Sequence, residues 1–214
     1  MNPNEYTVAP QLQKFNIPFH NFRLKNPRYA HFVGGAIIFL TTAERDTVKI
    51  LLLQRAKHVK FGTYWEFPGG KCEEKDPTYL HATAREILEE TGLHVSKFVK
   101  LVNQCEWQKE DESYVAKFTF IVEVHELGPT APASSEDLVT LDDKEHQKFA
   151  WATEGDVKAS SDDENSGDEN GTFRFFGNQR EIVLKAFADL GKILSPGACY
   201  SGSYCDVSSG SAAP

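Results

Sequence analysis

The stretch Gly69–Leu93, GGKCEEKDPTYLHATAREILEETGL, decides the fold that this sequence predicts. Asp76 and Pro77 indicate a helix start, because a short carboxylate can cap exposed backbone N–H groups and proline at the first helical position loses no needed donor. Gly92 indicates the end of the helix. Apolar side chains recur between these limits at helical spacing, at Leu80, Ala84, Ile87 and Leu88. The stretch therefore predicts one amphipathic helix.

Three glutamates, Glu86, Glu89 and Glu90, lie on this helix away from the apolar side chains. Because residues three and four apart are neighbours on a helix, the three carboxylates share one face. A solvated acidic face is the usual explanation of such a run. Clustered carboxylate oxygens are also the ligands that Mg²⁺ prefers, and the cation removes their mutual repulsion. The segment Trp65–Gly70, read as a strand running into a glycine pair, favours the metal site, since glycine lets a backbone approach a ligand closely.

The stretch resembles the Nudix box, G-x5-E-x7-R-E-U-x-E-E-x-G-U, where U is a bulky aliphatic residue. Gly70 matches the opening glycine, and Arg85–Leu93 matches the closing nine positions. Asp76 departs from the pattern, because it stands where the box has glutamate and is separated from Arg85 by eight residues instead of seven. With flanking features the resemblance extends over about residues 30–155. The order of elements supports the class α/β, and the resemblance implies a Nudix α/β/α sandwich with a mixed β-sheet.

The extra residue of the box is expected before the helix. An insertion inside the helix would rotate the later helical residues by about 100°, and the apolar side chains stay in phase with one another. Asp76 is therefore expected to cap the helix, and Glu73 or Glu74 to take over the contact of the box glutamate.

For function, the resemblance implies Mg²⁺- or Mn²⁺-dependent hydrolysis of a nucleoside diphosphate linked to another group, with water attacking phosphorus. The expected metal ligands are Glu86, Glu89 and Glu90, and Arg85 and Glu86 are expected in the catalytic machinery. Glutamates that hold a metal are poor bases, so a carboxylate from another element is expected to activate water. Glu145, on the loop before the Trp151 strand, is the carboxylate expected to activate water. The competitors are Glu106, Glu110, Glu112 and Glu86 itself.

Substrate contacts are expected from Arg55 and from Gly69, Gly70 and Lys71. Arg55 ends the second expected strand, in the pattern LLLQRA, which resembles a Nudix strand whose arginine contacts substrate phosphate or the metal-binding glutamates. An ion pair at the rim is an equal alternative. The basic residues Lys57, His58 and Lys60 come after it. Trp107 either stacks on a base or is a half-buried structural side chain.

Composition limits the class of protein and the partners that this sequence allows. The 214 residues are 40% hydrophobic and 25% charged, and no apolar run approaches the roughly 20 residues of a membrane helix. A formal charge of −8 argues against a nucleic-acid backbone as the main partner. The four cysteines fit no zinc pattern and no signal peptide precedes them, so a soluble protein of a reducing cytoplasmic compartment is expected, without excluding the nucleus.

The sequence predicts three parts. Residues 1–29 form an arm that packs on the domain, lines the substrate entrance or mediates a homodimer, and residues 30–194 form one domain. Residues 160–171 read as a disordered acidic insertion and 195–214 as a flexible tail, so removing either is expected to leave the fold unchanged. The expected strands and last helix are Ala30–Leu40, Val48–Gln54, Val95–Gln108, Tyr114–Val124 and Asn178–Ile193.

Two other functions stay open. One is a Nudix-fold binding or sensing module without turnover, which the intact Glu86, Glu89 and Glu90 argue against. The other is an interaction protein that recruits partners through Ser160–Gly171.

Overall fold

A computed structural model describes residues 5–41, 47–127, 138–160 and 173–194. Strands and helices occur in the order β1 Thr7–Val8, η1 Pro10–Phe15, α1 Phe19–Lys25, β2 Tyr29–Thr41, β3 Val48–Arg55, β4 Trp65–Glu66, α2 Tyr79–Thr91, β5 Val95–Gln108, β6 Tyr114–Val124, η2 His125–Leu127, β7 His146–Thr153, α3 Glu154–Ala159 and α4 Gln179–Leu194. The β5 and β6 bounds are those predicted from the sequence, and β2, β3 and α4 differ from prediction by one residue at most at either end.

The strands form one mixed sheet in the order β1-β5-β6-β2-β3-β4, and β7 pairs with β3. The pairs β2–β6 and β1–β5 are parallel, whereas β5–β6, β2–β3, β3–β4 and β3–β7 are antiparallel. The β3–β7 pair sets Arg55 opposite His146, although the two residues are far apart in sequence. The sheet thus brings the end of β3 beside the loop that precedes β7.

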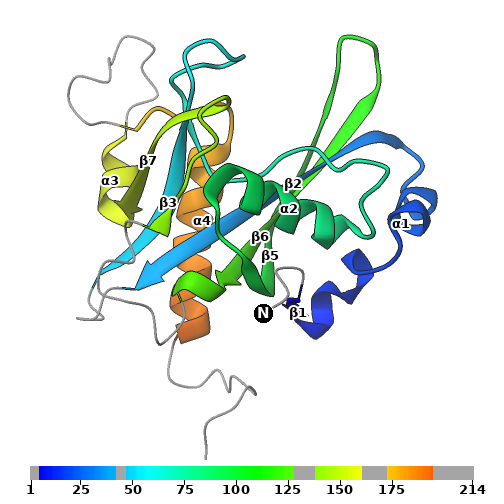
Figure 1. The fold of residues 1–214 in the computed structure, drawn as a ribbon, viewed down its shortest axis with the longest axis horizontal. Coiled ribbons are helices and arrows are strands. Elements are labelled where there is room, and N and C mark those ends of the chain that lie inside the picture. Colours follow the sequence, from blue (N-terminus) through cyan, green and yellow to red (C-terminus); the bar gives the residue numbers. More distant parts are fainter. Residues whose placement is uncertain (1–4, 42–46, 128–137, 161–172, 195–214) are drawn as a thin grey trace, which may run out of the picture.

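Helices cover both faces of the sheet (Figure 1). One core cluster joins α2 and the N-terminal helices to the sheet and includes Phe118 and Phe120 of β6. A second cluster joins α3 and α4 to the sheet and includes Ile121 of β6. Because both faces are covered, β6 buries apolar residues on both sides. The predicted α/β class and the layered sandwich with a mixed sheet are confirmed.

The N-terminal arm packs into the first core cluster. Strand β1 extends the sheet beside β5. The buried arm residues are Leu12, Phe15, Phe19 and Phe22. Phe15 alone meets the rings of Phe22, Tyr79, Phe118 and Phe120 at centroid distances of 5.0 to 5.8 Å. Of the three interpretations of the arm, the structure shows that it packs on the domain. The sequence did not predict η1 and α1, because these short helices have no clear hydrophobic periodicity.

Replacing Phe15 by alanine is expected to lower the free energy of unfolding by about 3–5 kcal/mol, because Phe15 is 1% exposed and the deleted ring leaves a cavity. Urea unfolding measures the change. Leu24→Ala on the same arm is the control, since Leu24 is 65% exposed. Equal, small effects of the two changes would show that the arm is not part of the cooperative fold.

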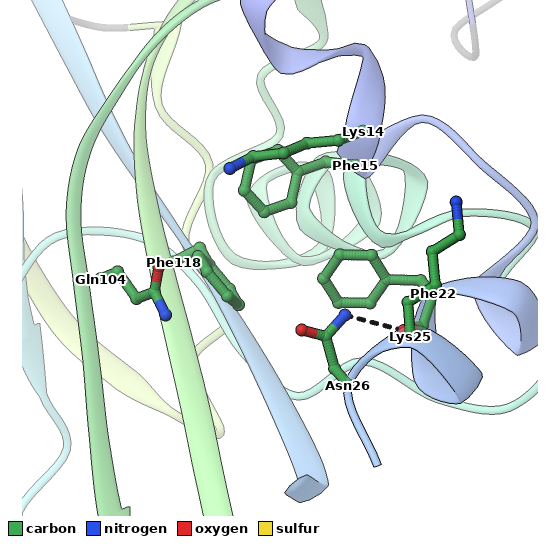
Figure 2. Close-up of a pocket in the computed structure, with 7 residues that line it drawn as sticks. All are labelled: Lys14, Phe15, Phe22, Lys25, Asn26, Gln104 and Phe118. Carbon is green, nitrogen blue, oxygen red and sulfur yellow. Dashed lines mark hydrogen bonds between the residues drawn. The ribbon is translucent and has the colours of Figure 1, made fainter. Parts of the chain in front are cut away.

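A hollow of about 240 Å³ lies between the arm and the β5–β6 strands (Figure 2). Its lining residues are Lys14, Phe15, Phe22, Lys25, Asn26, Gln104 and Phe118. The Asn26 amide donates to the Phe22 carbonyl at 2.8 Å, which closes one side. Since its three phenyl rings are buried among the core residues, the hollow is part of the contact between arm and sheet.

One prediction near the acidic segment needs correction. Helix α3 begins at Glu154, and Asp156 is its third residue, joined to Thr153 in a capping box. Ser160 is buried and accepts a hydrogen bond from Arg180 Nε at 2.9 Å, so it belongs to the α3–α4 contact and not to an insertion. Residues 161–171 and the predicted tail lie outside the described residues. Among the helices that are described, none is long and apolar enough to cross a membrane.

Candidate active site

Helix α2 runs without interruption from Tyr79 to Thr91. The Thr78 side chain caps its start and accepts a hydrogen bond from His81 N at 3.0 Å. Gly92 ends it in the left-handed conformation, φ 71°. The prediction that the extra box residue is absorbed before the helix is confirmed. The prediction that Asp76 caps the helix is wrong, because Thr78 stands directly before the first helical residue.

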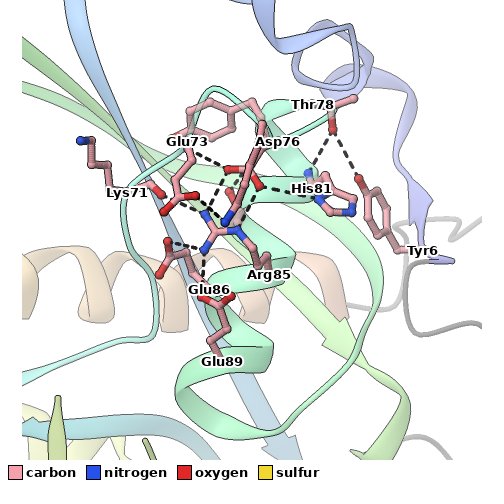
Figure 3. Close-up of polar contacts among 12 residues, drawn as sticks. Tyr6, Lys71, Glu73, Asp76, Thr78, His81, Arg85, Glu86 and Glu89 are labelled. Carbon is pink, nitrogen blue, oxygen red and sulfur yellow. Dashed lines mark hydrogen bonds and ion pairs between the residues drawn. The ribbon is translucent and has the colours of Figure 1, made fainter. Parts of the chain in front are cut away.

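Asp76 instead binds Arg85 (Figure 3). Its two oxygens accept from Arg85 Nε and Nη2, each at 3.0 Å, and one also accepts from Glu73 N at 2.8 Å. Burial alone would raise the pKa of Asp76, but these hydrogen bonds hold it below its usual value. The predicted substitutes do not replace it, since Glu73 pairs with Lys75 and Glu74 with Arg23.

Asp76→Asn is expected to lower the free energy of unfolding by about 1–3 kcal/mol, because Arg85 keeps Glu86 and Glu89 as partners but its Nε and Nη2 lose the charged acceptor that they share. The Asp76 side chain is 2% exposed. Urea unfolding at neutral pH is the measurement. Glu74→Gln, at an exposed ion pair of the same loop, is the control and is expected to change nothing measurable. A matching small effect in both variants would contradict the structural role of Asp76.

The three box glutamates have different surroundings. Arg85 Nη1 donates to Glu86 Oε1 at 2.9 Å and to Glu89 Oε2 at 2.8 Å (Figure 3). Glu90 is 6% exposed and accepts from Gly69 N at 2.8 Å. The alternative of a solvated acidic face therefore does not hold for Glu90, because the Gly69–Gly70 loop covers it. The loop also meets Glu86: a Cβ on Gly70 would lie 2.1 Å from Glu86 Oε2, so any larger residue here would displace the Glu86 carboxylate.

Carboxylates are crowded at this end of α2. Burial raises the pKa of Glu86; Arg85 opposes the shift, and the charges of Glu89 and Glu145 add to it. Burial also raises the pKa of Glu90 well above its usual value. The hydrogen bond from Gly69 N lowers this pKa, and the charges of Glu66, Glu86 and Glu145 raise it further. Within the described residues no three acidic, histidine or cysteine side chains are already arranged to hold a metal. The donor chemistry nevertheless fits Mg²⁺ or Mn²⁺, since crowded hard oxygens are what such cations neutralise.

Glu145 belongs to a different element from the box glutamates. It is exposed in the turn before β7, and its carbonyl accepts from Ala56 N at 2.8 Å. Its charge acts on both Glu86 and Glu90 and raises the pKa of each. Of its competitors, Glu106 is tied to Arg28 and Tyr29 close to the turn end of the β5–β6 hairpin, and Glu110 and Glu112 lie in the hairpin turn.

The structure adds side chains that the sequence motifs did not indicate. Glu66 lies between Arg55 Nη1, at 2.5 Å, and His146 Nε2, at 3.3 Å. Burial raises the pKa of Glu66, but His146 and Arg55 outweigh it and hold the pKa below its usual value. Lys117 of β6 is near Glu66 and Glu90, and its ammonium lies 4.5 Å from the centre of the Phe67 ring. The position of Glu66 just before the glycine loop could have indicated from the sequence that it lies near the site. No feature of the sequence indicates this for Lys117.

The expected substrate contacts are distributed around this site. Arg55 forms an ion pair, as one of its two interpretations predicted, and its partner is Glu66 instead of a box glutamate. Gly69 and Gly70 contact Glu90 and Glu86. The Lys71 side chain is exposed, and its carbonyl accepts from Arg85 Nη2 at 3.1 Å. Trp107 is 42% exposed and stands opposite Val115 in the β5–β6 hairpin.

Comparison with known proteins finds similar sequences and similar folds. Phosphatase NudJ of Escherichia coli strain K12 is 32% identical over 72 residues, which cover 34% of this chain and 46% of NudJ. The chain thus spans about half the length of the curated relatives it matches. The NUDIX domain of Shewanella oneidensis NrtR, complexed with ADP ribose, has a TM-score of 0.53 at 14% identity, covering 74% of this chain and 87% of that one. The C. elegans Ap4A hydrolase in a binary complex has a TM-score of 0.51 at 17% identity, covering 76% and 99%.

At such identities the two structures establish a shared fold. The NUDIX domain family matches this sequence over residues 31–175, well over half of its length. That range contains the box helix α2, the Gly69–Gly70 loop and Glu145. The chain therefore belongs to the NUDIX domain family.

Proposed function

We propose that the protein is a divalent-metal-dependent hydrolase that cleaves the diphosphate linkage of a nucleoside diphosphate joined to another group. The observation that carries the proposal is the gathering of carboxylates from α2 and the β7 turn beside a glycine loop. Such a cluster of carboxylates is stable only if protons or a cation neutralise its charge. A diphosphate is itself negatively charged, so its binding beside these carboxylates also requires cations.

In this proposal Glu86, Glu89 and Glu90 hold Mg²⁺ or Mn²⁺. The bound ion would neutralise charge on the diphosphate and lower the pKa of a coordinated water. Arg85 orients Glu86 and Glu89 through its Nη1 atom, and Asp76 orients Arg85. Gly69 and Gly70 admit the diphosphate close to the backbone, and Arg55 and Lys71 supply positive charge for its oxygens.

Glu145 is proposed as the general base. A water oxygen attacks phosphorus while its proton passes to a Glu145 carboxylate oxygen. The bond from phosphorus to the bridging oxygen breaks, and the electron pair leaves with the departing phosphate. Glu145 suits this role because it belongs to another element than the metal ligands and its charge is felt at Glu86 and Glu90.

The nucleotide character of the substrate is supported by the NrtR domain with ADP ribose and the Ap4A hydrolase, both similar in fold. The same NrtR complex favours the second candidate, a ligand-binding module without turnover. We favour the enzyme because the box arginine and all three box glutamates are present. The proposal includes a cytoplasmic protein, possible homodimerisation, and no nucleic-acid backbone or membrane as main partner. The segment required by the interaction-protein alternative lies mostly outside the described residues.

The test is a product-release screen with the full chain in Mg²⁺ or Mn²⁺, over dinucleoside, sugar-nucleotide and nucleoside triphosphate substrates. Metal-dependent release of a nucleoside monophosphate is expected for at least one diphosphate-linked compound. Binding of such compounds without turnover under either metal would favour the sensing module.

A further inference from the structure

Two phenylalanines from distant parts of the chain stack on each other at the surface. Phe61 lies in the loop between β3 and β4, and Phe176 lies just before α4. Their ring centroids are 3.8 Å apart and the planes differ by 27°. Phe61 is 40% exposed and Phe176 is 43% exposed, so much of both rings faces water. The two rings form one small aromatic patch on the surface, in contrast to a single exposed side chain.

The backbone under Phe61 is held in a disfavoured conformation. Phe61 has φ 59° and Thr63 has φ 72°, both in the left-handed region that non-glycine residues rarely adopt. The surrounding structure maintains it: Thr63 N donates to the Arg55 carbonyl at 3.0 Å, and a Cβ on Gly62 would lie 2.6 Å from the Lys57 carbonyl. Strain that the surroundings maintain is concentrated at ligand-binding sites, and here it presents a phenyl ring to solvent.

Cations and a further aromatic ring surround the pair. The Lys60 ammonium lies 5.1 Å from the centre of the Phe61 ring. Tyr64 meets Phe176 edge to face at 6.0 Å, and the Arg174 guanidinium covers Tyr64 at 4.1 Å. Aromatic faces beside flexible cations are the chemistry that holds a nucleobase together with its phosphates.

Arg55 fastens this loop to the candidate active site. Its Nε donates to the Lys60 carbonyl at 2.8 Å, and its Nη1 donates to Glu66 at 2.5 Å. Glu66 precedes Phe67 and the glycine loop, and its charge acts on Glu90. One arginine thus links the exposed ring pair to the carboxylates that carry the proposed chemistry.

We propose that Phe61 and Phe176 form the base-stacking subsite of this protein. A nucleobase packs on the ring pair and takes the place of the Lys60 ammonium over Phe61, and Lys60 turns toward the diphosphate. The inference rests on the proposed function for the diphosphate, but base binding does not require turnover. The subsite would make the protein prefer substrates that carry an aromatic base over diphosphates that carry none.

The experiment compares two probes by calorimetry in Mg²⁺ with the full chain: α,β-methylene-ADP, which resists hydrolysis, and methylenediphosphonate, which has no base. Phe61→Ala and Phe176→Ala are each expected to weaken binding of α,β-methylene-ADP about 10-fold, within the range for losing one base–aromatic stack, and to leave methylenediphosphonate unchanged. Phe176→Tyr keeps the ring and is expected to keep affinity. Leu24→Ala, at an exposed apolar residue of α1, is the matched control, and melting temperatures verify folding.

Unchanged affinity for α,β-methylene-ADP in folded alanine variants would overturn the subsite, as would no binding by the wild-type protein. An equal loss for methylenediphosphonate would also overturn it, because the effect would then not depend on a base. A loss in Trp107→Ala instead would move the base to the β5–β6 hairpin. Base-dependent binding through Phe61 and Phe176 without turnover of any diphosphate would refute the proposed hydrolase and leave the subsite intact.

Discussion

Replacing Glu90 by glutamine is expected to lower turnover by at least about 10³-fold while the protein stays folded. Glutamine keeps an oxygen that can accept from Gly69 N, so the contact between α2 and the glycine loop survives. It removes a ligand charge from a buried position, and charge stabilisation by a bound metal is worth several kcal/mol in the transition state. Product release at saturating Mg²⁺ and substrate, together with a thermal melt, measures both effects.

Glu123→Gln is the matched control, because Glu123 is an exposed glutamate of β6 that pairs with Lys97. It is expected to behave as the wild-type protein in both measurements. A folded Glu90→Gln variant with a near-normal turnover rate would contradict the assignment of Glu90 as a metal ligand.

Glu145→Gln is expected to depress saturated turnover by about 10²–10⁴-fold, the span for losing a positioned general base, while metal and substrate still bind. Glu145 is exposed in its turn, so its replacement removes no core contact. The turnover number at saturating substrate and the metal affinity by calorimetry are measured on the same preparation.

Glu106→Gln tests the rival hairpin carboxylate, which is tied to Arg28 and Tyr29. If Glu145→Gln lowers metal affinity and barely changes saturated turnover, Glu145 is a ligand and not the base. If Glu145→Gln changes neither, the role returns to Glu86 or to the hairpin, and a loss in Glu106→Gln would decide between them.

The sequence by itself determined the elements whose signals are local. Helix α2 and strands β5 and β6 were predicted closely because hydrophobic periodicity is set by neighbouring side chains. The box motif likewise identified the carboxylates of α2. Even within this stretch the cap was misassigned, since two residues, Asp76 and Thr78, suit the same position and the choice depends on where the loop is held.

Only the tertiary structure decided which side chains meet. Glu90 is buried because the glycine loop covers it, which no helical periodicity could show. The Arg55–Glu66–His146 contact exists because β3 pairs with both β4 and β7, and the Phe61–Phe176 stack joins segments more than a hundred residues apart. Sheet pairing and packing are long-range, so their outcome depends on the free energy of the whole fold and not on the spacing of residues along any one segment.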